Sequence, residues 1–583
     1  MSTRSNQPLH GWCGRRSKNS LNRIRIPSLS PLIQANTPYR KPPSRPRYLL
    51  PNGVLQHPNP ETTGNDEPRV ERGVGGLKWL LVILAVLSST FLYALDNTVT
   101  ASVRPSMIET FGNRVDMPCF HGFPPRTLWE KGTLYKLFNN KLLYLIAVLI
   151  FEIGSAVIGS ARSIEAVIAG RAVASSGGSG IYVGTINIIS DMTAEAERAV
   201  NLNHVGMCWC LGTILGPVIG GAFADSSATW RWAFYINICI AAVAVAAPAC
   251  IFLVPSSPPR AAGSSLWTRV KRIDYIGATL FLRGTLTIIM VLSFGGALYS
   301  WTSGQMIGLY VATAVIWSTF GIQQCWNLLT VDRIFPVQFF SDWAMAIFFC
   351  CGSLAIANVV MTVYSLPLLF QFVYGDTALG SAAYTIPFVA STVVFGGAAG
   401  PLFNRYPVYM PWFTDGAALM LIGNGLLTTI GYAVSRGAVC GYTVIQGAGC
   451  GPVTQLGYTV AQIKARRADP NSLPDVTGFM SCSQMAGLAL SLGIATTIFL
   501  NGTTRDIAII LPGVPRSVIQ ATIDGAGTSL VQGLSPELQL RVLEAIANNV
   551  ATVFYMNIAG AGLGLILSLF LKREKLQLGL PGR

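Results

Sequence analysis

The sequence predicts an all-α polytopic membrane protein, and three observations support that prediction. Of its 583 residues, 51% are hydrophobic and only 11% are charged, with a mean hydropathy of +0.48. A soluble domain carries about 25% charged residues. Apolar runs of about 20 residues, the length that crosses a bilayer, recur along the chain with short linkers. Each run is expected to be helical, because lipid offers no partner to open backbone groups.

The first 75 residues differ in composition from the rest of the chain. They are polar, basic and rich in proline, and the first acidic residue is Glu61. They contain no apolar run, so we expect no secretory signal peptide. Their prolines interrupt any amphipathic helix. We therefore expect residues 1–75 to form a disordered basic cytosolic tail.

About thirteen apolar spans follow this tail. The basic residues of the C-terminal tail, residues 572–583, place that tail in the cytosol by the positive-inside rule. Counting back from it also places two basic loops, 255–273 and 461–475, in the cytosol. The spans lie near residues 77–95, 142–160, 164–190, 205–225, 233–254, 274–294, 303–323, 344–371, 379–399, 411–432, 438–461, 476–500 and 548–571.

The same count places a long loop, residues 501–547, outside the cell. This loop has nearly balanced charge and begins with Asn501-Gly502-Thr503, an acceptor sequence for N-glycosylation. Because the sequence motif and the topology agree, we expect a glycan at Asn501.

The count of spans fails towards the N-terminus. Thirteen spans put the two basic tails on opposite sides, whereas the positive-inside rule places both in the cytosol. Only residues 106–141 leave room for another span, but they contain no apolar run and are interrupted by Pro124-Pro125. We predict that this segment replaces a second membrane helix, as a mistaken gene model or a degenerate copy would produce.

Small residues define one helix surface near the middle of the N-terminal half. Gly212, Gly216 and Gly220 are four residues apart in the uncharged run 205–223, so they share one helical face. Such a face lets two backbones approach closely inside a membrane. Pro217 is expected to bend this helix. These features suit a sliding or rocking contact.

Short motifs lie on four of the spans. The run Gly212-x3-Gly216-Pro217-x2-Gly220-Gly221 resembles the antiporter signature of a fifth family helix, with every fixed position present. Similar likenesses are seen for a first helix, a fourth helix and the start of a sixth, at Leu95-Asp96-Asn97-Thr98-Val99, Gly170-Arg171-Ala172 and Trp230-Arg231-Trp232. Together they resemble the major facilitator superfamily, in its fourteen-span drug:proton antiporter branch. Within that branch, the chain is most similar to fungal efflux pumps for toxins and other secondary metabolites.

Two motifs depart from the family pattern. Gly132 and Lys141 fit the gate-loop motif after the second family helix, but Lys136 stands where many members have aspartate. In the family that position locks a cytoplasmic gate. The sequence therefore does not decide whether this gate can lock. Ala174 and Ser175 depart from the fourth-helix pattern, which Gln446-Gly447-Ala448-Gly449 repeats weakly in the second half.

The resemblance implies a major facilitator fold of two six-helix bundles plus two extra central helices. It assigns residues 77–254 to the N-terminal bundle, 274–323 to two linker helices and 344–571 to the C-terminal bundle. The second family helix is then missing or degenerate at 106–141. Transporters of this kind hold their substrate near the midplane, between the bundles. We therefore expect the glycine face of residues 205–223 to let the two bundles approach each other.

Ionisable residues inside spans are costly, so each one is a functional hypothesis. Asp96 ends the first span, Glu152 lies in the middle of the next, and Arg171 lies in the fourth family helix. The resemblance implies a part for Arg171 in proton coupling, and the two carboxylates are proton-site candidates beside it. The structural alternatives are a helix-to-helix bridge for Arg171, an ion pair with Arg171 for Glu152 and a helix-end anchor for Asp96.

We expect a secondary active transporter that exports small amphipathic organic compounds, such as a toxin, drug or secondary metabolite, in exchange for protons. We place it in the plasma membrane, or alternatively in a vacuolar or vesicle membrane, as a monomer in the lipid bilayer. A siderophore or nutrient importer on the same fold is one alternative, and a non-transporting remnant is another.

Other classes of function find no support in the sequence. No Walker-type phosphate loop occurs, so ATP drive is not expected. No nucleophile–base set stands out, so we expect no enzyme and no cofactor. The twelve cysteines form no CxxC pair, which argues against a metal site or a disulfide framework. The net charge of +15 lies mostly in the N-terminal tail and short loops, so no nucleic-acid partner is expected.

Overall fold

The computed structural model of the chain divides into two compact units, Met1–Arg69 and Val70–Arg583. The structure describes residues 76–111, 133–193, 195–224, 226–244, 265–296, 298–330, 332–430, 434–469, 472–521, 523 and 533–576, all of which belong to the second unit. The predicted tail, residues 1–75, and Gly132 of the gate-loop motif lie outside the described residues.

Helices form almost all of the described part, and nine of them are long and apolar enough to cross a membrane. The predicted all-α membrane fold is therefore confirmed. Thirteen helices of the described part have 13 residues or more: α1 (Gly76–Phe111), α4 (Asn140–Gly159), α5 (Ile164–Met192), α6 (Glu195–Ala224), α7 (Trp232–Ala244), α10 (Tyr275–Phe294), α11 (Gly304–Trp326), α12 (Trp343–Phe372), α14 (Ile386–Arg405), α15 (Tyr409–Leu427), α16 (Arg436–Ala468), α17 (Leu473–Ile510) and α20 (Pro536–Leu569). Shorter helices connect them: α3 (Thr133–Leu137), α9 (Leu266–Lys271), η2 (Val337–Ser341), α13 (Ala378–Ala383) and α18 (Arg516–Ala521).

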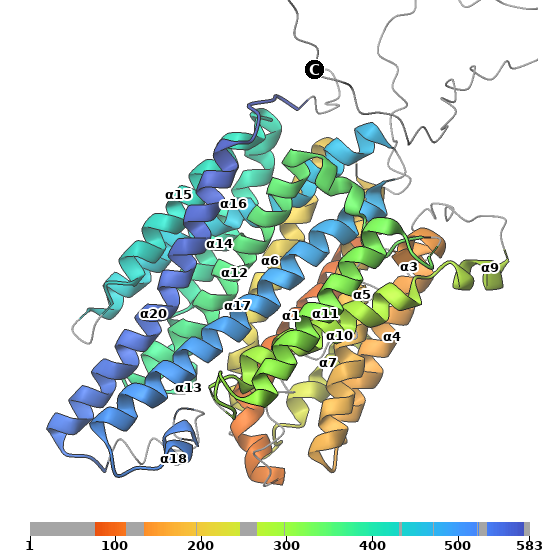
Figure 1. Cartoon of the computed structure of the whole chain (residues 1–583). Helices are drawn as coiled ribbons and strands as arrows, with labels where there is room; N and C mark the ends of the chain where they lie inside the picture. The colour runs from red at the N-terminus through yellow and green to blue at the C-terminus, as the bar shows by residue number, and fades with distance from the viewer. Residues whose placement is uncertain are drawn as a thin grey trace, which may run out of the picture. The chain divides into compact units, whose positions relative to one another are not determined.

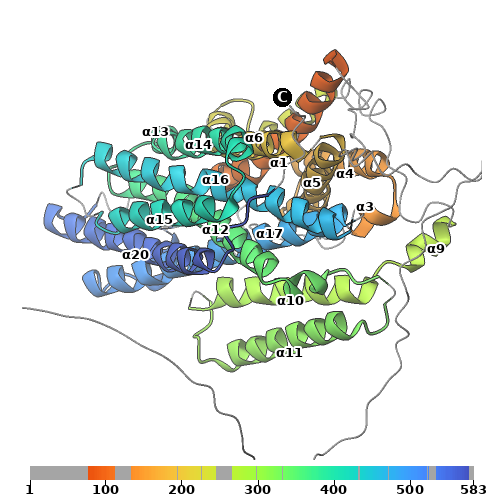
Figure 2. The same cartoon turned by 90° about the horizontal axis from the view of Figure 1, so that it is seen from above.

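The long helices form two bundles and a separate pair (Figure 1). We call α1 and α4–α7 the N-terminal bundle, and α12, α14–α17 and α20 the C-terminal bundle. Helices α10 and α11 lie side by side outside both bundles (Figure 2). Thr497 on α17 ties this pair to the C-terminal bundle, because its hydroxyl donates to the Leu292 carbonyl at 2.6 Å.

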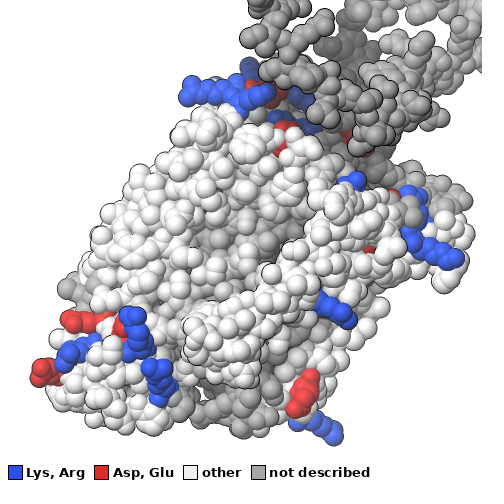
Figure 3. Space-filling view, in the orientation of Figure 1, with Lys and Arg blue, Asp and Glu red and all other residues white. Residues whose placement is uncertain are grey.

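The surface pattern agrees with a bilayer position. Lys, Arg, Asp and Glu side chains gather towards two ends of the face seen in Figure 3, and most of the surface between them is uncharged. Apolar side chains are exposed on the long helices, for example Leu149 on α4 and Val311 on α11. Lipid tails are expected to cover these side chains, since exposed apolar surface of this extent is unusual in soluble proteins.

We call the end of the bundles that holds the C-terminal segment the inner end, because that basic tail is expected in the cytosol, and we call the opposite end the outer end. At the inner end, Ser190 donates to the Gln462 side chain at 3.0 Å, and Lys464 lies 3.8 Å from Glu574 of the C-terminal segment. At the outer end, the Phe111 ring packs on Trp230, with 5.9 Å between their centroids. Helix α1 ends at this outer end, so it begins at the inner end, where the C-terminal segment also lies.

The chain therefore leaves α1 and enters α3 at opposite ends of the N-terminal bundle. Arg231 donates to the Ala161 carbonyl at 2.9 Å, which places the C-terminal end of α4 beside Trp230 at the outer end. At the inner end, Asn140 in the first turn of α4 donates to Asp191 at 2.9 Å. Of the segment 106–141, the described residues belong to the end of α1, to α3 and to the start of α4. The rest, 112–132, lies outside the described residues, so the loss of a second membrane helix stays a prediction.

The sequence around Asn501 differs from the expected loop. Helix α17 continues to Ile510, so the outer connection begins ten residues later than predicted. Asn501 is half-buried within this helix, and its Nδ2 donates to the Gly295 carbonyl at 2.9 Å. A glycan would be attached to this same nitrogen. Glycosylation therefore stays a prediction, and it would have to occur before α17 packs against α10.

The glycine face of α6 packs inside the N-terminal bundle. A Cβ added at Gly212 would lie 2.6 Å from the Phe91 carbonyl oxygen, and one at Gly216 would clash with Thr98. Both neighbours belong to α1. The predicted close approach of two backbones is therefore present, but the partner is α1 of the same bundle rather than a helix of the other bundle. Gly220 is buried, Pro217 lies inside α6, and a Cβ added at Gly221 would meet no atom within 4 Å.

This packing makes a prediction about stability. Gly216→Leu would force α1 and α6 apart and should destabilise the protein by about 1–3 kcal/mol or more, because overpacking a close contact displaces backbone. Gly221→Leu is the matched control, since its side chain would enter open space. Size-exclusion profiles after heating would measure the effect, and equal melting of both variants would contradict the assigned contact.

Candidate functional site

A buried ion pair joins two helices of the N-terminal bundle. Arg171 on α5 and Asp96 on α1 are 7% and 1% exposed, and Nη1 of the guanidinium lies 2.6 Å from Oδ2 of the carboxylate. The same nitrogen lies 3.4 Å from the Asp96 carbonyl oxygen. Removing one member of a buried pair leaves the other charge uncompensated, which is strongly destabilising. These two residues therefore depend on each other.

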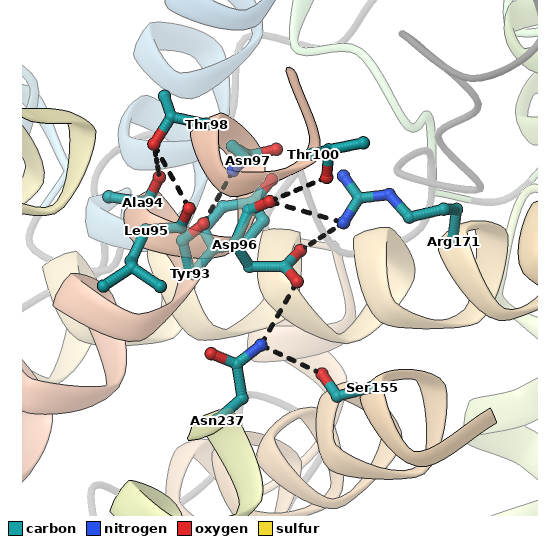
Figure 4. Close-up of polar contacts among 10 residues, drawn as sticks. All are labelled: Tyr93, Ala94, Leu95, Asp96, Asn97, Thr98, Thr100, Ser155, Arg171 and Asn237. Atoms are coloured by element: carbon teal, nitrogen blue, oxygen red, sulfur yellow. Dashed lines mark hydrogen bonds and ion pairs between the residues drawn. The ribbon is translucent and has the colours of Figure 1, made fainter. Parts of the chain in front are cut away.

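A third helix reaches the same carboxylate directly, and a fourth is linked to it through that helix (Figure 4). Nδ2 of Asn237 on α7 donates to Oδ1 of Asp96 at 3.2 Å, and lies 3.3 Å from the hydroxyl of Ser155 on α4. Thr100, one turn after Asp96, donates its hydroxyl to the Asp96 carbonyl at 3.0 Å. Four helices thus meet at Asp96, which is a central junction and not the helix-end anchor of the structural alternative.

Glu152 lies one turn before Ser155 on the same helix. Both of its carboxylate oxygens are buried, and neither makes a hydrogen bond to a residue that the structure describes. Asp96 acts on it electrostatically, as a like charge. The predicted alternative of a Glu152–Arg171 pair is wrong, because Asp96 takes the guanidinium. The site consequently holds two carboxylates and one paired cation.

The gate-loop residues lie away from this cluster. Lys141 is in the first turn of α4 at the inner end, where Asn139 caps the helix by accepting from the Lys141 backbone N–H at 3.0 Å. Eleven residues separate Lys141 from Glu152, which is about 16 Å along a helix. The structure does not bring the gate-loop residue Lys141 into the Asp96 cluster.

A second polar cluster lies in the C-terminal bundle. Asn424 on α15 donates to Asn358 on α12 at 2.7 Å, and Gln446 on α16 donates to Asn424 at 2.9 Å and to Thr362 at 2.6 Å. The repeat around Gln446 pointed to this position on α16. All four side chains are uncharged, whereas the N-terminal cluster contains an ion pair and a second carboxylate.

A small cavity lies between the two bundles. Helices α5 and α6 line it from one side, and α12, α14, α16 and α17 line it from the other. Its volume of about 40 Å³ has room for a few water molecules, and organic ligands occupy pockets of about 300–1,000 Å³. The bundles must therefore move apart before an organic molecule can enter.

Uncharged hydrogen bonds join the bundles around this cavity and at the inner end. Tyr182 on α5 donates to Gln484 on α17 at 2.8 Å. Further towards the inner end, Gln462 accepts from Ser190 and donates to Thr477 at 3.0 Å. We did not single out these residues from the sequence. Glutamines inside otherwise apolar spans were the available signal.

Comparison with known proteins agrees with this architecture. The profile of the Major Facilitator Superfamily matches residues 131–492. The MFS-type transporter pgmG of Aspergillus terreus is 36% identical over 529 residues, covering 88% of this chain and 92% of that protein. The efflux pump alnA of Emericella nidulans is 36% identical over 520 residues, covering 88% of this chain and 93% of that protein.

A solved structure supports the fold alone. It is a bacterial homolog of the human lysosomal transporter Spinster in an inward-facing, unoccupied conformation, with 14% identity and a TM-score of 0.51. The alignment covers 85% of this chain and 98% of that one. The profile, the relatives and the two-bundle structure lead to one conclusion: the chain belongs to the major facilitator superfamily of membrane transporters.

Proposed function

We propose that the chain is a proton-coupled exporter of small amphipathic organic compounds. Relatives that are one-third identical over most of their length are named efflux pumps, among them alnA of Emericella nidulans and patC of Aspergillus clavatus. Those names favour export over the siderophore or nutrient importer. The observation that supports the proton coupling is the buried Asp96–Arg171 pair together with Glu152, whose carboxylate makes no hydrogen bond to a described residue.

In this proposal Glu152 carries the proton. Its oxygens lie in a low-dielectric interior without a hydrogen bond to described residues, so its ionised form is costly there. Asp96 instead has Arg171 and Asn237 as donors, which stabilise its negative charge. The two carboxylates can therefore have different roles. Glu152 binds the proton, and Asp96 holds the helices together.

Protonation of Glu152 then changes the forces on the ion pair. A charged Glu152 repels Asp96, and a protonated one does not. Asp96 and Arg171 join α1 to α5, and α1 packs against the glycine face of α6, which also lines the central cavity. A change at the pair can thus reach the surface between the bundles, whose rocking alternates access to the cavity. We place this cycle in a monomer at the plasma membrane.

The first prediction concerns the proton carrier. Glu152→Gln should remove the dependence of export on the pH gradient, because glutamine keeps the shape but binds no proton. Folding should be retained, since no hydrogen bond to a described residue is lost. The measurement is uptake into inside-out vesicles, which corresponds to export from the cell, of a compound to which the chain confers resistance in a drug-sensitive yeast strain.

The wild type provides the decisive comparison for this experiment. Export by the wild-type chain that persists after collapse of the pH gradient would contradict proton coupling itself. Full pH-gradient dependence in Glu152→Gln would remove only the role of Glu152. Absence of resistance despite correct delivery to the plasma membrane would favour the non-transporting remnant.

The second prediction concerns the ion pair. Asp96→Asn should destabilise the protein by about 3–5 kcal/mol, because the Arg171 guanidinium is left buried without a counter-charge. Replacing both residues, with Asp96→Asn and Arg171→Gln together, should recover much of that stability without restoring export. Melting of the purified proteins and the vesicle assay would measure the two effects. A double variant that melts no higher than Asp96→Asn would contradict the mutual dependence.

A further inference from the structure

Two buried amide side chains line the central cavity with unused hydrogen-bonding atoms. Asn203 on α6 is 3% exposed, and neither Oδ1 nor Nδ2 bonds to a described residue. Gln455 on α16 is 8% exposed, and its Oε1 likewise has no partner in the described part of the chain. Buried polar groups in proteins are nearly always paired. Because these two residues share one cavity, their unused atoms are available to a ligand that binds there.

These amides face the cavity from opposite bundles. Asn203, Gly206, Met207 and Cys210 line it from α6, and their spacing of three and four residues places them on one helical face. A Cβ at Gly206 would lie 2.8 Å from Cγ and from Nε2 of Gln455. The missing side chain at Gly206 therefore admits Gln455 of the C-terminal bundle to the surface of α6.

The other lining side chains restrict the chemistry of the ligand. They are mostly apolar or aromatic, and within the described part of the chain they include no Asp, Glu, Lys, Arg or His. The Trp209 ring lies edge-on to Tyr182 at 5.1 Å between centroids, and to Tyr93 of α1 at 5.3 Å. A charged ligand would lose its hydration here without gaining a counter-ion, which is costly. The charges of the Asp96 cluster do not line the cavity.

We propose that the exported compound is uncharged at neutral pH, with hydroxyl or carbonyl oxygens on a largely apolar skeleton. It hydrogen-bonds to Asn203 from one bundle and to Gln455 from the other, because a primary amide offers both a donor and an acceptor. The compound therefore bridges the bundles, while the proton binds elsewhere. This inference rests on the proposed exporter function and specifies its substrate.

Binding to the purified full-length protein in lipid nanodiscs tests the inference without requiring transport. The uncharged oxygenated probes are cycloheximide and griseofulvin, the cationic probe is rhodamine 6G, and the anionic probe is fluorescein at pH 7.5. Titration calorimetry should detect binding of at least one uncharged probe and no binding of the two charged probes. Asn203→Leu and Gln455→Leu should each weaken that binding by about tenfold, since each removes a hydrogen bond of typical net strength.

Asn557→Leu is the matched control. Asn557 on α20 is also a buried amide whose side-chain atoms make no hydrogen bond to described residues, but it does not line the cavity. This variant should bind the uncharged probe with wild-type affinity. Melting curves identify any variant that fails to fold, and Gln455→Met then replaces Gln455→Leu in the same comparison.

Several outcomes would overturn the inference. They are binding of rhodamine 6G or fluorescein as tight as that of the uncharged probes, binding of neither uncharged probe, or unchanged affinity in both cavity variants. Failure of the exporter proposal is a different observation. In that case uncharged probes bind as expected, but transport of a bound probe does not respond to collapse of the pH gradient.

Discussion

The low dielectric of the membrane interior is the constraint on which this structure depends, and the Asp96–Arg171 pair shows its effect most directly. A lone charge at that depth is costly, so the two residues are held 2.6 Å apart and are further supported by Asn237. Asn237 in turn bonds to Ser155. These four residues belong to α1, α5, α7 and α4, so the electrostatic requirement also sets how these helices pack. Among the described residues of the same bundle, Glu152 is a buried carboxylate without a hydrogen bond, and for that reason we propose that its charge changes.

The two halves of the protein use different polar chemistry at comparable places. The N-terminal bundle joins its helices through an ion pair, whereas α12, α15 and α16 are joined by Asn358, Asn424 and Gln446. Amides do not titrate, so in the proton coupling that we propose, protonation would act on the N-terminal cluster and leave the amide cluster unchanged. Such an asymmetry suits a transporter in which one bundle moves relative to the other.

Helix α6 connects these features because its faces have different partners. Gly212 and Gly216 contact α1 inside the N-terminal bundle, and Asn203 and Gly206 face the C-terminal bundle. We expected the glycines themselves to form the contact between bundles, and that expectation was wrong. One face of α6 contacts α1 next to Asp96, so a movement of α1 would displace α6. The other face of α6 forms part of the cavity wall.

The sequence by itself determined the membrane class, the approximate positions of the thirteen long helices and the three ionisable candidates, while the resemblance to a known family implied the two bundles. Those properties follow from apolar runs and local motifs, because solubility in lipid is decided segment by segment. The tertiary structure decided that Arg171 pairs with Asp96 and not with Glu152, and that Asn203 and Gln455 meet at one cavity. Asp96 and Arg171 are 75 positions apart, and Asn203 and Gln455 are even further apart. Which polar side chains meet over such separations depends on how the helices rotate and pack, and no local pattern records that.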